Sequence, residues 1–323
     1  MTRTLVTGGS GFIGSNLIRH LGAQGHTLLN LDLAEPMDAE ARALWRRQDI
    51  LDAAGLRAQV EAFDPDFIVH LAARTDLDGR SLADYPANTT GVQNLIDAAA
   101  AAPRLRKVIF ASSRLVCRIG YQPTGPRDYQ ATTPYGQSKV EGEKLVYADR
   151  SLRAEWAIVR PTSIWGPFFR VPYRNFFDAV RRGHYVQPRG VRVHKSFGFV
   201  GNTVVQLQRL LEAEPGRIHG QMYYLADYEP LELHDWSGRV ARTMGVRAPR
   251  EIPMAVLQLM ARTGDLLAAL GWRGVPLTSF RLDNLITPMV HDLEPLRAVC
   301  GPTPHSLEDG VRATVAWIQQ GTA

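Results

Sequence analysis

Short apolar runs alternate with longer amphipathic stretches along the first half of the chain. Ile13, Leu17 and Leu21 recur at the spacing of one helix face. Gly25 predicts the end of this helix, because glycine readily adopts the left-handed conformation of a C-terminal cap. The apolar runs predict five strands, at residues 4–7, 27–31, 67–71, 107–111 and 156–159. Strands that alternate with helices predict a doubly wound α/β domain, in which helices cover both faces of a parallel sheet.

The regular alternation stops near Gly166, where prolines, aromatic residues and basic residues become frequent. It returns at residues 199–211 and 222–225, and most of the chain after Tyr228 has a helical pattern. We therefore expect a large first domain and a smaller, mostly helical C-terminal domain that binds the substrate. The expected domains are 1–165 with 196–225 returning to it, and 166–195 with 226–323.

The composition is that of a globular protein: of 323 residues, 45% are hydrophobic and 21% are charged. No stretch approaches the ~18 consecutive apolar residues of a membrane-spanning helix, and the N-terminus lacks the apolar run of a secretory signal. Cys117 and Cys300 cannot form a disulfide framework, and there is no CxxC pair for a metal or redox site. We therefore expect a reduced, cytoplasmic protein with neither a bound metal nor a membrane partner.

The formal net charge is +5, and all but four of the 37 basic residues are arginine. An arginine-biased composition explains this simply, whereas a positive cleft that attracts an anionic substrate is the functional alternative. Basic pairs such as Arg46-Arg47 and Arg181-Arg182 are short and scattered, and no basic stripe is interleaved with aromatic residues. Nucleic acid is therefore not expected as a partner.

The sequence GGSGFIG, at residues 8–14, follows the first predicted strand and opens the first predicted helix. Glycines at Gly8, Gly11 and Gly14 allow a tight turn and let the backbone approach a pyrophosphate at the helix N-terminus. The spacing alone is a weak signal and also fits a structural turn, but its position between a strand and a helix favours dinucleotide binding.

Asp32 ends the second predicted strand, 18 residues beyond Gly14. An acidic residue near this offset usually holds the adenosine ribose hydroxyls, and its charge repels the 2′-phosphate of NADP. No Arg or Lys lies at residues 31–35 to accept that phosphate. Although a turn or cap role for Asp32 is the simpler alternative, the pattern favours NAD.

Tyr135 and Lys139 are four residues apart and therefore share a helix face, and Pro134 suits the start of that helix. A tyrosine with a pKa near ~10 is a poor base at neutral pH, but a neighbouring cation favours its phenolate. Ser112-Ser113 ends the fourth predicted strand, at the carboxyl edge where doubly wound sheets bind ligands. We predict that Tyr135 transfers a proton while a serine hydroxyl holds the reacting oxygen. The alternative for Tyr135 and Lys139 is a pair of neighbours on the protein surface, and the alternative for Ser112-Ser113 is a serine that only forms a turn.

Together these motifs resemble the extended short-chain dehydrogenase/reductases, specifically the NAD-dependent epimerase/dehydratase family of nucleotide-sugar enzymes. The similarity spans most of the chain and includes residues 7–14, Asp49-Ile50, His70-Leu71-Ala72-Ala73, Asn88, Gly91, Asn94-Leu95, Ser112-Ser113, Tyr135 to Lys139, Arg160-Pro161, Trp165-Gly166-Pro167, Ser306 to Val311 and Trp317. The resemblance implies a Rossmann-type domain with NAD as its cofactor.

The resemblance also implies roles for individual residues. Asp49 and Ile50 would lie beside the adenine, Ala72 and Ala73 beside the nicotinamide ribose, and Lys139 would also hold that ribose. The cofactor-binding residues it implies are Gly8, Gly11, Phe12, Ile13, Gly14, Asp32, Asp49, Ile50, Leu71, Ala72, Ala73, Asn88, Tyr135 and Lys139. The implied catalytic residues are Ser113, Tyr135 and Lys139, and the implied substrate-binding residues are Ser113, Ser163, Asn175 and Lys195, the last on a nucleotide phosphate.

Three departures from the family pattern bear on the chemistry. Arg114-Leu115 stands where sugar 4,6-dehydratases carry Asp-Glu and where decarboxylases keep the Glu, so neither activity is expected. Cys117 replaces a usual Tyr, and Ser163 replaces an Asn common in sugar epimerases. These last two changes leave the identity of the substrate open.

We expect an NAD-dependent epimerase of a nucleotide sugar, acting at C4 through a transient keto intermediate. One alternative is an NAD(P)-dependent 4-keto nucleotide-sugar reductase or a dehydrogenase of another bulky alcohol. A non-catalytic NAD-binding regulator is a third, which the intact Ser113, Tyr135 and Lys139 disfavour. A homodimer is also expected, through the helix at residues 98–102 and the helix that carries Tyr135.

Overall fold

The structure is a computed structural model that describes residues 1–169, 173–272, 275 and 277–321. Within this part of the chain the strands are β1 (Arg3–Thr7), β2 (Thr27–Asp32), β3 (Trp45–Arg47), β4 (Phe67–His70), β5 (Lys107–Ala111), β6 (Glu155–Pro161), β7 (Ser163–Trp165), β8 (Val186–Pro188), β9 (His194–Lys195), β10 (Phe197–Phe199), β11 (Gln221–Leu225), β12 (Leu231–Glu232) and β13 (Arg250–Ile252). The α-helices are α1 (Phe12–Ala23), α2 (Ala53–Phe63), α3 (Thr90–Ala100), α4 (Pro134–Ala148), α5 (Tyr173–Arg181), α6 (Val200–Glu212), α7 (Leu233–Thr243), α8 (Met254–Ala269), α9 (Ser279–Ile286), α10 (Glu294–Cys300) and α11 (Leu307–Gln320).

A seven-stranded parallel sheet in the order β11-β6-β5-β4-β1-β2-β3 forms the centre of the larger domain. In its middle, Leu5 of β1 lies opposite Leu29 of β2 and Ile68 of β4. These positions are buried, because helices cover both faces of the sheet. All five predicted strands form within two residues of their expected bounds, and the doubly wound Rossmann-type fold is confirmed.

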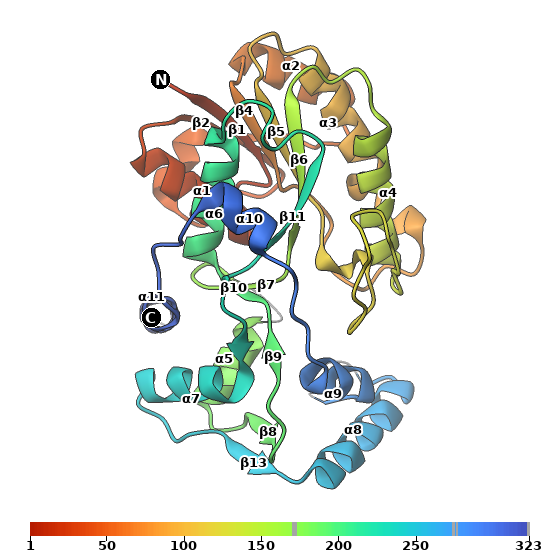
Figure 1. Cartoon of the computed structure of the whole chain (residues 1–323), viewed down its shortest axis with the longest axis vertical. Coiled ribbons are helices and arrows are strands. Elements are labelled where there is room, and N and C mark those ends of the chain that lie inside the picture. The colour runs from red at the N-terminus through yellow and green to blue at the C-terminus, as the bar shows by residue number, and fades with distance from the viewer. Residues whose placement is uncertain (170–172, 273–274, 276, 322–323) are drawn as a thin grey trace.

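Helices cover the sheet in two layers (Figure 1). On one face α1 packs against α6, and on the other α2 packs against α3 and α3 against α4. The fully buried Leu17 and Leu21 of α1 belong to the predicted apolar face, and α1 ends at Ala23, two residues before Gly25, which has a φ of +79°. Among the described residues, no helix has the length and apolar character needed to cross a membrane.

The smaller lobe contains α5, α7, α8 and α9, which lie below the sheet in Figure 1. Three short strand pairs (β7 with β10, β8 with β13, β9 with β12) hold its connecting segments together. The chain leaves the larger domain after β6 and returns to it in α6 and β11. Near the C-terminus, α10 packs on α6 and β11, so this part of residues 226–323 lies on the larger domain.

An aromatic cluster joins the two parts of the molecule. Trp165 is fully buried, and its ring centroid lies 5.4 Å from the centroids of both Phe199 and Trp236. Trp236 of α7 also stacks on Phe176 of α5, with 4.3 Å between centroids. The same apolar cluster includes Val6 of the central strand β1. The lobes therefore share one core.

We expect Trp236→Ala to lower the free energy of unfolding by about 3–5 kcal/mol, because it removes a buried aromatic ring from this shared core. Trp272 is 67% exposed, whereas Trp236 is 3% exposed. The matched variant Trp272→Ala should therefore change stability by no more than about 0.5 kcal/mol. Urea unfolding of the two variants checks this. Equal losses would show that Trp236 does not hold the lobes together.

Candidate active site

The predicted cofactor and catalytic residues gather at one edge of the sheet. The glycine loop follows β1, Leu71 to Ala73 follow β4, and Ser113 follows β5, and these three strands are neighbours. The strand order reverses between β1 and β4, and ligands of doubly wound sheets bind at such a switch point, beyond the carboxyl ends of the strands. We place the candidate active site here.

Two glycines let the loop pack against its surroundings. Gly8 has a φ of +75°, and a Cβ atom there would lie 2.5 Å from the backbone nitrogen of Ala72. A Cβ atom on Gly14 would lie 2.2 Å from the carbonyl oxygen of Gly8. At Gly11, the N-cap of α1, a Cβ would meet only the Gly8 oxygen, at 3.2 Å, and no side chain caps the helix. The open backbone at this N-terminus fits a pyrophosphate.

Asp32 lies against this loop. Its Oδ2 accepts a hydrogen bond from the Ser10 amide and its Oδ1 one from the Ala34 amide, each at 3.0 Å. The carboxylate therefore sits at the carboxyl end of β2 beside the glycine loop, a position that suits an adenosine ribose. Together with the loop, it gives the chain a set of residues that fits NAD.

Asp49 and Ile50 lie beyond β3, in a short segment that α3 holds in place. Asp49 Oδ1 accepts a hydrogen bond from the Leu51 amide at 2.9 Å, and Asn94 of α3 donates to the Ile50 carbonyl at 2.9 Å. Ile50 is buried, and a Cβ on Gly91 would lie 2.6 Å from its Cδ1 atom. The contact of these two residues with adenine stays a prediction.

Asn88 is fully buried, and its side-chain amide joins two parts of the site. Its Oδ1 accepts from the Arg74 amide, and its Nδ2 donates to the Arg74 carbonyl and to Ser138 Oγ, all at 2.9 Å. Asn88 thus ties the segment that follows β4 to helix α4. A direct contact with the cofactor stays a prediction.

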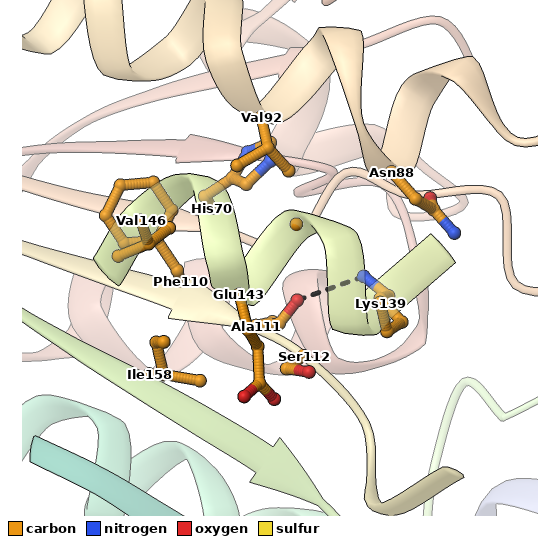
Figure 2. A pocket seen from close by; sticks show the side chains of 11 residues that line it. His70, Asn88, Val92, Phe110, Ala111, Ser112, Lys139, Glu143, Val146 and Ile158 are labelled. Atoms are coloured by element: carbon orange, nitrogen blue, oxygen red, sulfur yellow. Dashed lines mark hydrogen bonds between the residues drawn. The ribbon is translucent and has the colours of Figure 1, made fainter. Parts of the chain in front are cut away.

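The structure brings Ser113 and Tyr135 into contact. Helix α4 begins at Pro134, and its N-cap Thr133 accepts a hydrogen bond from the Gly136 amide at 3.0 Å. Tyr135, in the first turn, is 7% exposed, and its phenol lies close enough to the Ser113 hydroxyl for that group to lower its pKa. One turn later, Lys139 donates to the Ala111 carbonyl at 3.0 Å, at the end of β5 (Figure 2).

Burial controls the ionisation of both α4 residues. Burial raises the pKa of Tyr135, and the nearby Ser113 hydroxyl opposes that rise. Burial lowers the pKa of Lys139 to about 8, against the opposing charge of Glu143. Burial is the larger effect, so the pKa of Tyr135 lies above its ordinary value, and the influence of the Lys139 ammonium on the phenolate stays a prediction. A further positive charge, such as that of an oxidised nicotinamide, would favour the phenolate.

A small cavity of about 20 Å³ lies behind Lys139, with His70, Ser112 and Glu143 in its lining (Figure 2). His70 Nδ1 is hydrogen-bonded to Thr7 Oγ1 at 2.7 Å. Within the described residues, His70 Nε2 and Ser112 Oγ are buried without a hydrogen-bond partner. The volume and these polar atoms suit one water molecule. Burial, with the Lys139 charge, lowers the pKa of His70 to about 3, so this histidine is neutral at pH 7.

A buried ion pair holds α4 on the sheet. Arg160 of β6 contacts Glu143 at 2.7 Å, and neither side chain is more than 1% exposed. Arg160 also donates to the Tyr224 hydroxyl at 3.3 Å and to the Pro126 carbonyl at 2.6 Å. Sequence analysis missed this pair, although Glu143 lies four residues beyond Lys139, on the same helix face.

The predicted substrate residues differ in their surroundings. Ser163 of β7 and Lys195 of β9 are buried, whereas Asn175 of α5 is exposed. The Lys195 ammonium donates to the Asn284 carbonyl, and burial together with the Arg114 charge lowers its pKa to about 8. The substrate roles of all three residues stay predictions.

Comparison with known proteins agrees with this geometry. Residues 4–210 match the NAD dependent epimerase/dehydratase family. The chain belongs to this family. It is therefore an NAD-dependent enzyme, as the glycine loop and Asp32 predicted.

Relatives of this family member differ in what they act on. This chain is 28% identical to a 3 beta-hydroxysteroid dehydrogenase/Delta 5→4-isomerase of Mycobacterium tuberculosis, and the match covers 77% of this chain and 71% of the relative. It is 26% identical to a 2-alkyl-3-oxoalkanoate reductase of Stenotrophomonas maltophilia, over 96% and 97%. The fold matches a UDP-glucose 4-epimerase of Thermotoga maritima with a TM-score of 0.75, at 19% identity and full coverage of both chains.

The buried His70 predicts a loss of stability in acid. The unfolded chain protonates this histidine below its ordinary pKa of 6.5, but the folded chain resists protonation down to about 3. The unfolded state therefore binds more protons across this interval, and the free energy of unfolding falls as pH falls through it.

Between pH 7 and pH 5, we expect the free energy of unfolding to fall less in His70→Gln than in the native chain. The variant has no histidine at this position that the unfolded chain could protonate. Urea unfolding at both pH values measures the difference. The control His184→Gln replaces an exposed histidine and should follow the native chain. If His70→Gln also followed the native chain, His70 would not be the group that resists protonation.

Proposed function

We propose that this enzyme is a nucleotide-sugar epimerase that acts at C4 through a transient keto intermediate. The observation that carries the proposal is the proximity of the Ser113 and Tyr135 side chains, at the same sheet edge as the glycine loop. A phenol and a hydroxyl in contact there suit proton transfer to and from the oxygen of a secondary alcohol. Bound NAD would accept the hydride from the sugar and, in an epimerase, return it to the opposite face.

Each residue of the catalytic group has a distinct part. Tyr135, in its phenolate form, accepts the proton of the sugar hydroxyl at its phenolic oxygen, and the Ser113 hydroxyl holds the oxygen that loses it. Lys139, fixed by the Ala111 carbonyl, remains mostly protonated at pH 7 because its pKa is about 8, so it supports the phenolate that forms. The Glu143 carboxylate raises the pKa of Lys139 and thereby favours this charged form.

The charge of residues 166–195 favours a nucleotide sugar. This segment contains seven basic residues and one acidic residue, so it attracts the diphosphate of such a substrate. The solved UDP-glucose 4-epimerase, whose fold matches over the whole chain, supports the same substrate class. Arg114 and Leu115 follow Ser113 and supply no carboxylic acid there, which disfavours the elimination of water or carbon dioxide.

A net oxidoreductase that acts on a bulky apolar alcohol or ketone is the second candidate. The relatives named as a steroid dehydrogenase and an alkanoate reductase match over more than two thirds of both chains, which favours it. This candidate uses the same Ser113, Tyr135 and Lys139 and differs in the fate of the hydride. A non-catalytic regulator would not need the Ser113–Tyr135 contact.

The homodimer stays a proposal, but its expected surface changes. Ala98, Ala99 and Ala102 are buried against Leu95, Val146 and other residues of the chain's own core. A dimer would therefore need the outer faces of α3 and α4. Light scattering at micromolar concentration tests the proposed homodimer, and a monomeric mass would contradict it.

We expect the purified enzyme to interconvert a C4 epimer pair of UDP-, GDP- or dTDP-sugars without net turnover of NADH. Tyr135→Phe should lower this rate by about 10²–10⁴-fold, because it removes the group that transfers the proton. Bound NAD, identified after denaturation of the protein, should be retained in the variant. Tyr147→Phe is the control: the Tyr147 hydroxyl has no hydrogen-bond partner within the described part of the chain.

Two results would contradict the epimerase proposal. Stoichiometric turnover of NAD(P)H with an apolar ketone, and no epimer formed from any sugar nucleotide, would favour the second candidate. Full activity of Tyr135→Phe would remove Tyr135 from the chemistry.

We expect Asp32→Ser to weaken NADH binding by about tenfold and to narrow the preference for NADH over NADPH, because the carboxylate that repels a 2′-phosphate is lost. Fluorescence titration with the two nucleotides measures both effects. Glu35→Gln removes a neighbouring, exposed negative charge and should leave the preference unchanged. An unchanged ratio in Asp32→Ser would mean that Asp32 does not face the ribose.

A further inference from the structure

Exposed apolar side chains concentrate in one part of the smaller lobe. Among the described residues, fourteen large hydrophobic side chains are exposed, and seven of them lie at residues 256–280. Leu259, Leu266, Leu270 and Trp272 are each more than 60% exposed. A concentration of this kind marks an interaction surface, whereas single exposed leucines do not.

Helix α8 has three distinct faces. At about 100° per residue, Leu257, Ala261 and Gly264 fall on one narrow stripe. This stripe is buried against α9, where a Cβ on Gly264 would overlap the Leu277 carbonyl. A second face is polar and exposed, with Gln258, Arg262 and Asp265.

The third face is exposed and mostly apolar, with Thr263 as its polar member. Val256, Leu259, Met260, Leu266 and Leu270 fall within an arc of about 120° on the helix, which we call the α8 stripe. All five side chains are more than 40% exposed, so the described part of the chain does not cover this face. The exposed indole of Trp272 follows two residues after the stripe ends.

Arginines surround the entry to this helix. Arg250 lies in β13, which leads directly into α8, and Arg189 donates its backbone amide to Ile252 at the end of β13. Arg247 is exposed three residues before Arg250, Arg262 is exposed in the middle of α8, and the exposed Glu251 lies beside Arg250 in β13. The segments 166–195 and 226–323 together hold sixteen basic and twelve acidic residues, so they carry four of the five net positive charges.

This combination determines which partner fits the surface. An apolar helix face with flanking arginines and a terminal tryptophan is the pattern of helices that lie in the interface of a bilayer. Anionic headgroups complement the arginines, whereas a second copy of this chain would bring the same positive charge to the contact. In Figure 1, α8 and β13 lie at the end of the lobe far from α2 and α3, where a flat surface can approach them.

We propose that the α8 stripe docks the enzyme on the surface of an anionic phospholipid bilayer. The helix lies in the headgroup plane with its leucines inserted, and the arginines contact the lipid phosphates. The sequence-based expectation of no membrane partner rested on the lack of a spanning segment, and α8, with 16 residues, does not span a bilayer. The docking is independent of which alcohol the active site oxidises.

Co-sedimentation of the full-length chain with phospholipid vesicles tests the proposal. We expect the native chain to bind mixed phosphatidylserine/phosphatidylcholine vesicles and to bind pure phosphatidylcholine vesicles much more weakly. Leu259→Glu combined with Leu266→Glu should lower the bound fraction by about tenfold or more, since both side chains leave the apolar phase. Arg250→Gln combined with Arg262→Gln should reduce the preference for phosphatidylserine.

The control places the same charges on exposed leucines elsewhere. Leu77 and Leu82 are 51% and 40% exposed in the larger domain, so the pair Leu77→Glu and Leu82→Glu should bind vesicles like the native chain. Equal binding by the two glutamate pairs, or no binding of the native chain to phosphatidylserine, would overturn the proposal. A dimer that the α8 pair alone dissociates, measured by light scattering without lipid, would assign the stripe to a second copy instead. The assay contains no sugar nucleotide, so its result does not depend on the proposed reaction.

Discussion

The ion pair between Glu143 and Arg160 lies where water does not reach, and the position of α4 depends on it. Removing two charges from water is costly, and a buried pair is stable only when other groups satisfy the remaining hydrogen-bonding positions. Here the Tyr224 hydroxyl and the Pro126 carbonyl accept from Arg160, and the Tyr129 hydroxyl donates to Glu143 at 3.0 Å. With these contacts the pair fixes α4 against β6.

The same contacts extend from the larger domain into the smaller lobe. The ring of His291 stacks on Tyr224, with 4.0 Å between centroids, and its backbone amide donates to Ser196 Oγ at 2.9 Å. Burial, with the charges of Arg114 and Arg160, lowers the pKa of His291 to about 4, so this ring is neutral at pH 7. The position of the chain near residue 291 is thus linked through Tyr224 to the ion pair that positions α4.

Local signals were enough to predict much of the fold and the centre of the site. The glycine loop, the five strands and the Tyr135–Lys139 pair each lie in a short stretch of sequence. Hydrophobic runs reveal the strands, the glycines reveal the turn, and the four-residue spacing reveals the shared helix face. β3 has only three residues and gives no pattern of its own. The Glu143–Arg160 pair joins residues of separate elements, so it becomes visible only when the sheet places β6 beside α4.

The direction of the Tyr135 pKa shift could not be predicted for a related reason. The sequence shows which charges are near along the helix, but the extent of desolvation depends on what packs over the residue. Tyr85, from the segment that follows β4, lies with its ring centroid 6.0 Å from that of Tyr135 and is fully buried. Likewise, an alanine-rich helix predicts close packing without indicating whether its partner is the chain itself or a second subunit, and Ala98 and Ala99 pack within the chain.

Because the smaller lobe is assembled from separate segments around Trp165, it has no boundary at which it could be exchanged as a module. A recombination event that brought in a foreign lobe would have to replace the ends of β6 and β7, the return through β10 and α6, and the aromatic rings that meet Trp165, all at once. Substitutions in the loops over the sheet edge, in contrast, would leave these aromatic contacts in place.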